Sequence, residues 1–529
     1  MRHVKVHGIH QSPAPNFLVH LREFQEAIIT RRARILIIAA ALLALFLGAL
    51  DALVVAAAMP SIIADLGGLP LYSWAFSAYL LARAVALPIF GKLCDQVSSR
   101  KLYLGAILIF VISSALAGAA VSMGQLIFFR TLQGIGAGGT FALAYIVLSD
   151  LYPPERRGKM MGLISLVWGI SSILGPPLGG FMVAFASWRW IFYMNLPLGG
   201  LALLGIALYL EDTRVKKRFS SIDFPGAITL SIAVTALLSA FLLAGRDYPW
   251  LSIQIGGLLC LFLAAGAGFY FAEKRAEEPI LALSFFWKRR FSLANGAAFF
   301  SSFAIFSLSA FTPLFVQGVL GRSPARVGLA MIPLSLGWSL GAMFCGQKVT
   351  PSSERTFSIA GSALLFTGSA LALVFSSPAV PLPLFSAMLS IAGVGMGFVS
   401  IPTLLIVQKS LTAADLGVAT SSQQFARTLG GTIGIGISGG LVMNHMAGVL
   451  ENLMGSSLKE AIPEALAARL ATNLESLFQP GVQEALSPIA RESLRSAIGG
   501  SVDIVFWGAL LTSLVSLALC RLLPRGDAE

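Results

Sequence analysis

The chain has 529 residues, of which 56% are hydrophobic and only 12% are charged. A soluble domain carries charge on roughly 25% of its residues, so this composition excludes an ordinary soluble protein. The formal net charge of +12 does not indicate nucleic-acid binding, because Lys and Arg collect in the cytoplasmic loops of membrane proteins. We therefore expect the lipid bilayer as a partner and no nucleic acid.

Runs of about 20 apolar residues, the length that crosses the hydrocarbon core, follow one another along the chain. They predict an all-α polytopic membrane protein with 14 transmembrane helices. The predicted spans are residues 35–58, 73–93, 102–121, 126–149, 160–185, 190–210, 223–243, 253–271, 292–317, 326–346, 356–376, 382–408, 418–445 and 501–523.

Two segments outside these spans carry an apolar helical stripe. Residues 1–34 form a tail before the first span, and within it residues 16–30 are expected to lie on the membrane interface. Residues 446–500 form a long external loop with apolar residues at every fourth position, which is typical of an amphipathic helix. Such a helix can cap the exit of a transport pathway or rest on lipid or protein, and we favour the second.

The distribution of basic residues predicts the orientation in the membrane. If the N-terminus is cytoplasmic, inside segments hold 26 of the 37 Lys and Arg residues and outside segments hold 8. Positive charge marks the cytoplasmic side. We therefore expect a multi-pass protein of the cell (inner) membrane with both termini in the cytoplasm.

The glycines indicate an internal repeat. Gly91 and Gly346 close spans 2 and 10 and lie 255 residues apart, and the glycines of span 5 recur in span 13 at the same offset. The chain therefore divides into an N-terminal six-helix half (35–210), a two-helix insertion (223–271) and a C-terminal six-helix half (292–523). Two such halves are the architecture of an alternating-access transporter, for which a monomer is sufficient.

Three charged residues fall at similar depth within the predicted spans, where charge is costly and so indicates function. At 1.5 Å per residue, Asp51 lies roughly 10 Å, Arg130 about 6–9 Å and Arg83 about 15 Å from the outer surface. We expect a shared polar network. Asp51 then either carries a proton across the membrane or only pins helices together, and we favour the proton.

Spans 4 and 5 contain glycine patterns with different consequences. Four glycines at 134, 136, 138 and 139 give span 4 a smooth face for close helix packing. The run Gly175-Pro176-Pro177-Leu178-Gly179-Gly180 in span 5 also removes two backbone donors, which predicts a kink with a mechanical role.

Together these residues resemble the major facilitator superfamily, and specifically its fourteen-helix drug:proton antiporter family, over nearly the whole chain. The resemblance lies in five motifs taken in order: residues 50–60 in span 1, 91–101 in loop 2–3, 130–136 in span 4, 175–180 in span 5 and 188–199 before span 6. Gln96 and Ser98 depart from the usual loop 2–3 motif, where a basic residue and a glycine are typical.

The resemblance implies roles for residues at the matching positions. Asp51 and Arg130 would couple transport to protons, with a proton gradient rather than a cofactor as the energy source. The gate would use Gly91, Asp95, Arg100 and Lys101 on the cytoplasmic side, and the hinge would use Gly175, Pro176, Gly179 and Gly180.

Polar and aromatic residues of the inner spans are candidates for a substrate cavity. They are Arg83, Asn295, Gln317, Trp338, Gln423, Gln424 and Arg427. Because arginines outnumber acids in the spans, we expect a neutral or anionic amphiphile rather than a dication.

The sequence thus predicts a proton-coupled exporter of small hydrophobic or amphiphilic compounds of the multidrug efflux type. Two alternatives stay open: export of a specific endogenous metabolite or lipid, and a transporter-like membrane sensor.

Overall fold

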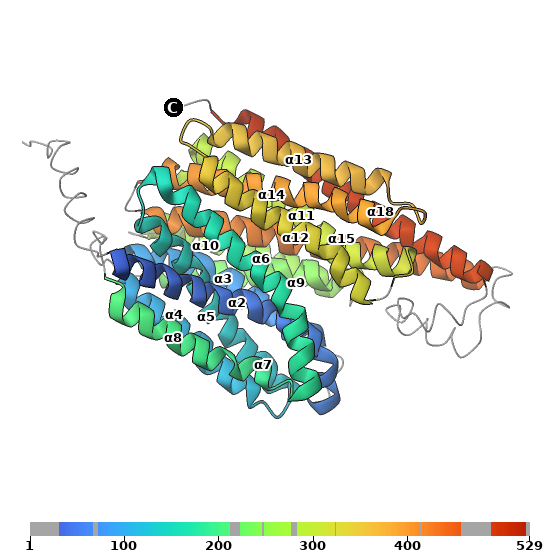
Figure 1. The fold of residues 1–529 in the computed structure, drawn as a ribbon, viewed down its shortest axis with the longest axis horizontal. Coiled ribbons are helices and arrows are strands. Elements are labelled where there is room, and N and C mark those ends of the chain that lie inside the picture. Colours follow the sequence, from blue (N-terminus) through green and yellow to red (C-terminus); the bar gives the residue numbers. More distant parts are fainter. Residues whose placement is uncertain are drawn as a thin grey trace, which may run out of the picture.

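The computed structural model describes residues 31–66, 72–211, 223–245, 248–276, 283–322, 324–412, 415–455 and 488–524, and helices dominate throughout (Figure 1). The first bundle consists of α2 (Arg31–Leu66), α3 (Tyr72–Gln96), α4 (Ser99–Gly118), α5 (Met123–Asp150), α6 (Pro154–Phe185), the short α7 (Trp190–Tyr193) and α8 (Asn195–Tyr209). The helices α9 (Phe224–Leu243) and α10 (Ile253–Arg275) and the 3-10 helix η2 (Leu283–Trp287) follow. The second bundle consists of α11 (Arg289–Leu314), the π-helix η3 (Phe315–Val319), α12 (Pro324–Lys348), α13 (Glu354–Val374), α14 (Leu382–Ser410), α15 (Leu416–Gly455) and α18 (Pro488–Leu522).

Twelve segments of the described residues are long and apolar enough to cross a membrane. The chain is therefore a multi-pass integral membrane protein. The predicted spans 73–93 and 418–445 coincide with α3 and α15, which are helical but are not among the twelve. These two helices pack against each other, so protein rather than lipid covers much of their surface and they can carry more polar residues.

Several boundaries differ from the sequence prediction. The predicted span 190–210 is divided at Met194 into α7 and α8. The predicted loop 446–500 is helical at both ends, since α15 continues to Gly455 and α18 begins at Pro488. Hydropathy alone does not detect these extensions, because charged and amide residues interrupt the apolar ones, Glu451 and Asn452 in the first extension and Arg491, Glu492 and Arg495 in the second. Residues 456–487 of that loop and the predicted interfacial helix 16–30 lie outside the described residues.

Glycines set the distances between helices inside both bundles. A Cβ added to Gly136 of α5 would lie 2.5 Å from the backbone nitrogen of Phe110 in α4, and one added to Gly138 would lie 2.6 Å from the carbonyl oxygen of Arg83 in α3. In the second bundle, a Cβ on Gly395 of α14 would lie 2.7 Å from a carbonyl oxygen of α13. The glycine runs of α5 and α14 therefore allow close backbone contact at matching places in the two bundles.

Gly136→Ala is expected to destabilise the protein, because backbone atoms of α4 cannot move aside as a flexible side chain would. Overpacking of this kind costs about 1–3 kcal/mol. Gly105→Ala in α4 is the matched control, since nothing lies within 4 Å of the added Cβ. Thermal unfolding in detergent should show a lower Tm for the first variant only. Equal Tm values would show that α4 and α5 can separate at little cost.

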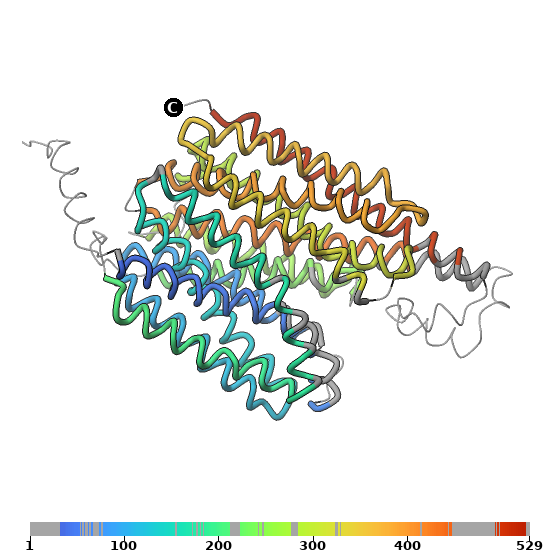
Figure 2. Tube along the Cα trace, in the orientation of Figure 1, coloured from blue at the N-terminus to red at the C-terminus, as the bar shows by residue number. Residues whose placement is uncertain are grey.

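The two bundles meet at one end of the molecule, here called the terminal end, which holds the start of α2 at Arg31 and the finish of α18 at Leu522 (Figure 1). At this end α3 faces α15 and α6 faces α12. A Cβ added to Gly158 would lie 2.8 Å from the carbonyl oxygen of Gly346, and one added to Gly91 would lie 2.9 Å from that of Gly417. Toward the opposite end the two bundles diverge, as the blue-to-teal and yellow-to-red traces of Figure 2 show.

Candidate functional site

Asp51 of α2 and Arg130 of α5 form an ion pair inside the first bundle, with 2% and 1% of their surfaces exposed. Gln133, one turn beyond Arg130, accepts a hydrogen bond of 2.8 Å from the same guanidinium. Its amide nitrogen donates to Oδ1 of Asp51 at 3.0 Å. The spacing of three residues places Arg130 and Gln133 on one face of α5, so both side chains reach α2.

Two further helices, α8 and α4, complete the surroundings of the carboxylate. Asn195, the first residue of α8, donates from Nδ2 to Oδ1 of Asp51 at 3.2 Å and to Oγ of Ser114 at 3.0 Å. Asn195 is 1% exposed and Ser114 is fully buried. We call Asp51, Arg130, Gln133, Asn195 and Ser114 the Asp51 cluster. Four helices of the first bundle therefore contribute hydrogen bonds to it, and these offset the cost of burying its two charges.

Tyr79 of α3 closes the Asp51 cluster on another side. Its ring centroid lies 4.1 Å from the guanidinium carbon of Arg130, and its hydroxyl donates to the carbonyl oxygen of Gly48 at 3.1 Å. Sequence reasoning did not assign a role to Tyr79, Gln133, Asn195 or Ser114. Gln133 and Asn195 fall within the motifs 130–136 and 188–199, whereas the only signal of Tyr79 and Ser114 was a polar group within an apolar span, which is common among transmembrane helices.

Arg83 takes part in a different group of residues. Its guanidinium carbon lies 4.4 Å from the ring centroid of Phe141 and 5.3 Å from that of Trp168. The ring centroid of Phe141 lies 5.0 Å from that of Tyr145, one turn further along α5. Arg83 therefore belongs to an aromatic environment, and the expected network that would join it to Asp51 and Arg130 is not among the hydrogen bonds of the described residues.

Arg427 approaches this environment from the second bundle. Its guanidinium carbon lies 5.5 Å from the ring centroid of Trp338 in α12, and Trp338 packs against the apolar core that contains Phe141 and Tyr145. Its Nη1 donates to Gln424 at 3.4 Å. We call Arg83, Phe141, Tyr145, Trp168, Trp338 and Arg427 the arginine–aromatic cluster. It contains residues from both bundles, and sequence reasoning had named only Arg83, Trp338 and Arg427.

The other residues predicted for a substrate cavity lie at different distances from this cluster. Gln424 donates to Gln423 at 3.0 Å, and Gln423 donates to Thr403 at 3.3 Å, so both adjoin the cluster. Asn295 lies near the start of α11 and donates to the carbonyl oxygen of Phe291 in its own helix at 2.9 Å. Gln317 lies in η3, at the other end of α11. Asn295 and Gln317 therefore lie at opposite ends of α11, and α11 contacts α15 through Phe299 and Gly430, about one turn beyond Asn295 and Arg427.

Asp95 links the two bundles at the terminal end. Its carboxylate accepts hydrogen bonds from the backbone nitrogens of Gly417 at 3.0 Å and Val418 at 3.1 Å, in the first turn of α15. A carboxylate at a helix N-terminus is favoured by unpaired N–H groups and by the helix dipole. Gly91, one turn earlier on α3, leaves room for this approach, because a Cβ there would lie only 2.1 Å from Oγ and 2.4 Å from Cβ of Ser421 in α15.

Arg100 and Lys101, also predicted for the gate, lie on the first bundle at the start of α4. The Arg100 side chain donates to the carbonyl oxygen of Ala207 in α8 of the same bundle. The backbone nitrogen of Lys101 donates to Oγ of Ser98 at 3.1 Å, so Ser98 acts as the N-cap of α4. The departure from the usual glycine at position 98 therefore has a local structural role.

A second polar contact crosses between the bundles near Asp95. Gln408 of α14 donates to Oγ of Ser149 in α5 and to Oγ1 of Thr420 in α15, both at 3.0 Å. All three side chains are buried. The terminal end is therefore closed by a carboxylate on a helix N-terminus and by a buried amide, and sequence reasoning had identified only the first.

The predicted hinge residues lie in α6, which continues as one helix from Pro154 to Phe185. Gly175 and Gly179 are buried. The first half of α6 faces α12 through Gly158, whereas the hinge lies toward the opposite end. Bending at the predicted hinge would therefore move the part of α6 that is distant from the bundle contact.

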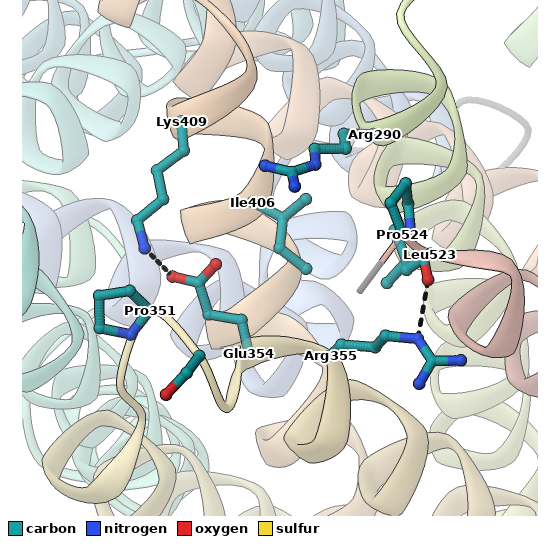
Figure 3. A pocket seen from close by; sticks show the side chains of 9 residues that line it. Arg290, Pro351, Glu354, Arg355, Ile406, Lys409, Leu523 and Pro524 are labelled. Atoms are coloured by element: carbon teal, nitrogen blue, oxygen red, sulfur yellow. Dashed lines mark hydrogen bonds and ion pairs between the residues drawn. The ribbon is translucent and has the colours of Figure 1, made fainter. Parts of the chain in front are cut away.

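A small pocket opens at the terminal end of the second bundle (Figure 3). Lys409 of α14 reaches across it to form an ion pair with Glu354 at the start of α13, and Arg355 donates to the carbonyl oxygen of Leu523 at 2.7 Å. These contacts hold the ends of α13, α14 and α18 together. The pocket shares no residue with the Asp51 cluster or the arginine–aromatic cluster, so its contribution is to the packing of one bundle.

Comparison with known proteins gives this arrangement a family. The model of the Major Facilitator Superfamily matches residues 41–435. Multidrug transporter protein MdtP of Bacillus subtilis is 36% identical over 490 residues, covering 92% of this chain and 90% of that protein. Multidrug resistance protein 3 of the same organism is 34% identical over 488 residues, covering 92% and 94%.

More distant proteins share the same organisation. Efflux pump FUS6 of Gibberella fujikuroi is 30% identical over 496 residues, covering 92% of this chain and 87% of that protein. Among solved structures, the human organic anion transporter MFSD10 (TETRAN) superposes with a TM-score of 0.57 at 15% identity, covering 90% of this chain and 99% of that one, which shows a shared fold. The chain belongs to the Major Facilitator Superfamily and is a membrane transporter of its multidrug efflux type, not an enzyme.

Proposed function

We propose that this transporter exports small hydrophobic or amphiphilic compounds in exchange for protons, by alternating access. The observation that carries the proposal is the buried ion pair of Asp51 and Arg130, which places a titratable carboxylate inside one bundle of a transporter. The names of the Bacillus relatives, a multidrug transporter and a multidrug resistance protein, support export of several compounds. The efflux pump of Gibberella supports the outward direction.

The proposed topology has fourteen spans. The helices α3 and α15 cross the membrane together with the twelve apolar segments, and the terminal end faces the cytoplasm of a cell (inner) membrane protein with both termini inside. The excess of Lys and Arg in the loops at that end supports this orientation. Contacts of Asp95 and Gln408 close the terminal end, so the described conformation is outward-facing. One chain contains both bundles, and a monomer is sufficient.

Protonation of Asp51 supplies the coupling. A proton from outside neutralises the carboxylate and removes its attraction for Arg130, while Gln133 and Asn195 can still hydrogen-bond to the acid. Arg130 then loses its counter-ion in a medium of low dielectric, which favours rearrangement of α2, α5 and α8. In the inward-facing conformation, Asp51 releases the proton to the cytoplasm. No cofactor takes part, because the proton gradient is the energy source.

The test is uptake of dyes of different charge into proteoliposomes with an acidic lumen, compared with liposomes of equal internal and external pH. A gradient of one pH unit is worth about 1.4 kcal/mol per proton, so one-for-one exchange should concentrate a neutral dye about tenfold. Equal dye uptake with and without the pH gradient would overturn proton coupling. Gradient-dependent uptake restricted to one lipid or metabolite would favour a specific exporter, and absence of transport for every compound would favour a sensor.

A further inference from the structure

We propose that the arginine–aromatic cluster binds the anionic group of a flat aromatic substrate between Arg83 and Arg427, so that this transporter prefers organic anions to organic cations. The inference rests on the proposed export function and names its substrate class. Two cations, one contributed by each bundle, lie against the same aromatic core. The guanidinium carbon of Arg83 is 4.4 Å from the ring centroid of Phe141 and that of Arg427 is 5.5 Å from the ring centroid of Trp338, and Trp338 packs against the apolar core that contains Phe141 and Tyr145.

The contacts that the structure gives these two arginines are with uncharged groups. Arg83 lies against Phe141 and Trp168, and Arg427 contacts Trp338 and Gln424. The buried Nε atoms of both arginines have no hydrogen-bond partner among the described residues. Arg83 is only 9% exposed, so water cannot readily replace the missing partner. The buried carboxylates on either side of Arg83 in the chain already have partners, because Asp51 is paired with Arg130 and Asp95 accepts hydrogen bonds from the first turn of α15.

A guanidinium that is buried, as in Arg83, or half-buried, as in Arg427, is costly without a counter-ion, and two of them also repel each other. Aromatic faces and a neutral amide offset only part of this cost. An external anion would remove both penalties, because a carboxylate or sulfonate can accept parallel hydrogen bonds from a planar guanidinium. A cationic ligand would add a third positive charge to the same place and raise the cost.

The aromatic side chains determine the rest of the substrate. Each arginine has a tryptophan beside it, Trp168 for Arg83 and Trp338 for Arg427. Trp338 follows Arg83 by 255 residues, the offset of the internal repeat, so the two bundles place an arginine or a tryptophan at equivalent positions of α3 and α12. Flat faces on both sides favour an aromatic body over an aliphatic one. The ligand class is therefore an aromatic carboxylate, sulfonate or phosphate.

The position of the cluster also connects it to the proton site. Tyr79 lies one turn before Arg83 on α3 and stacks on Arg130 in the Asp51 cluster. An anion bound at Arg83 and a proton bound at Asp51 therefore act on neighbouring turns of one helix, which gives substrate and proton a short route for mutual influence.

The test is isothermal titration of the full-length protein in detergent with two probes that share a ring but differ in permanent charge, 2-naphthalenesulfonate and 2-naphthyltrimethylammonium. We expect the sulfonate to bind at least about tenfold more tightly than the ammonium. Arg83→Ala and Arg427→Ala should each weaken sulfonate binding by about 10- to 100-fold, as loss of a charged hydrogen bond does. Arg83→Lys and Arg427→Lys, which keep the charge, should weaken it less.

Arg326→Ala is the matched control, because this arginine is exposed at the outer end of α12. The Arg326→Ala variant should bind the sulfonate as tightly as the wild type does. Equal binding of the two probes would overturn the proposal, as would sulfonate affinity unchanged within about twofold in both alanine variants. If cationic dyes accumulate under a pH gradient while the sulfonate does not bind, this inference fails and the exporter stands. If the sulfonate binds through both arginines but no gradient drives any dye, the inference stands and proton coupling fails.

Discussion

Asp51→Asn is expected to reduce gradient-driven dye accumulation to the level of equal pH, because an amide cannot bind and release the proton. For a gradient of one pH unit, the accumulation ratio should fall from about ten to about one. The variant resembles the protonated acid in shape, so Gln133 and Asn195 keep a partner. Dye binding and dye exchange without a gradient should therefore persist. Uptake is measured in proteoliposomes with an acidic lumen.

Arg130 loses its counter-ion in this variant, and removing one partner of a buried ion pair costs about 3–5 kcal/mol. Asp51→Glu therefore accompanies it as a variant that keeps a titratable group, and it should retain part of the accumulation. Asp65→Asn is the matched control, since Asp65 pairs with Arg189 at 3.0 Å at the exposed end of α2. Full accumulation by a folded Asp51→Asn variant would assign the proton to another group and leave Asp51 a structural role.

Asp95→Ala is expected to shift the protein toward the inward-facing conformation. The carboxylate makes two charge-assisted hydrogen bonds to the first turn of α15, and it makes them only while the terminal end is closed. Hydrogen bonds to charged groups contribute about 1.5–3 kcal/mol, which corresponds to a roughly 10- to 100-fold change in the equilibrium. Spin labels at Lys159 and Lys348, both exposed beside the contact of Gly158 with Gly346, report the separation of α6 and α12.

The four native cysteines are replaced by serine, and cysteines at positions 159 and 348 carry the spin labels. The distance between the two labels is measured by double electron–electron resonance. The short-distance population of the wild type should give way to a longer one in Asp95→Ala. Asp223→Ala removes a comparable cap, because Asp223 accepts from Gly226 at 2.8 Å, but within α9 alone. It should leave the distance distribution unchanged. An unchanged distribution in Asp95→Ala as well would show that Gln408 and the glycine contacts hold the gate without it.

Much of the architecture could be predicted because the bilayer imposes a length and a composition on every lipid-facing helix. Helix ends were less predictable where polar residues continue the helix beyond the apolar core, as at the start of α18. Charge is costly inside the bilayer, so Asp51 and Arg130 could be identified as functional candidates from the sequence without any knowledge of their contacts. The structure places these two residues in one ion pair.

The remaining site residues depend on helix rotation and packing, which span prediction does not determine. Asn295 and Gln317 are polar residues of the same predicted span, yet one bonds to its own helix and the other lies in a π-helix at the far end. Tyr145 and Trp168 look like ordinary lipid-facing aromatics in the sequence. Their proximity to Arg83 follows only from the way in which α3, α5 and α6 pack.

The central claim is that substrate and proton move in opposite directions through one protein. It is tested most directly by a proton flux driven by substrate alone. The proteoliposomes have equal internal and external pH and contain a pH-sensitive dye, and potassium with valinomycin clamps the membrane potential. They are loaded with a transported compound, which then leaves down its concentration gradient. Exchange of substrate for protons should acidify the lumen as the compound leaves the wild-type vesicles, and Asp51→Asn vesicles should show no acidification. Exit of the compound from wild-type vesicles with no change in luminal pH would contradict it.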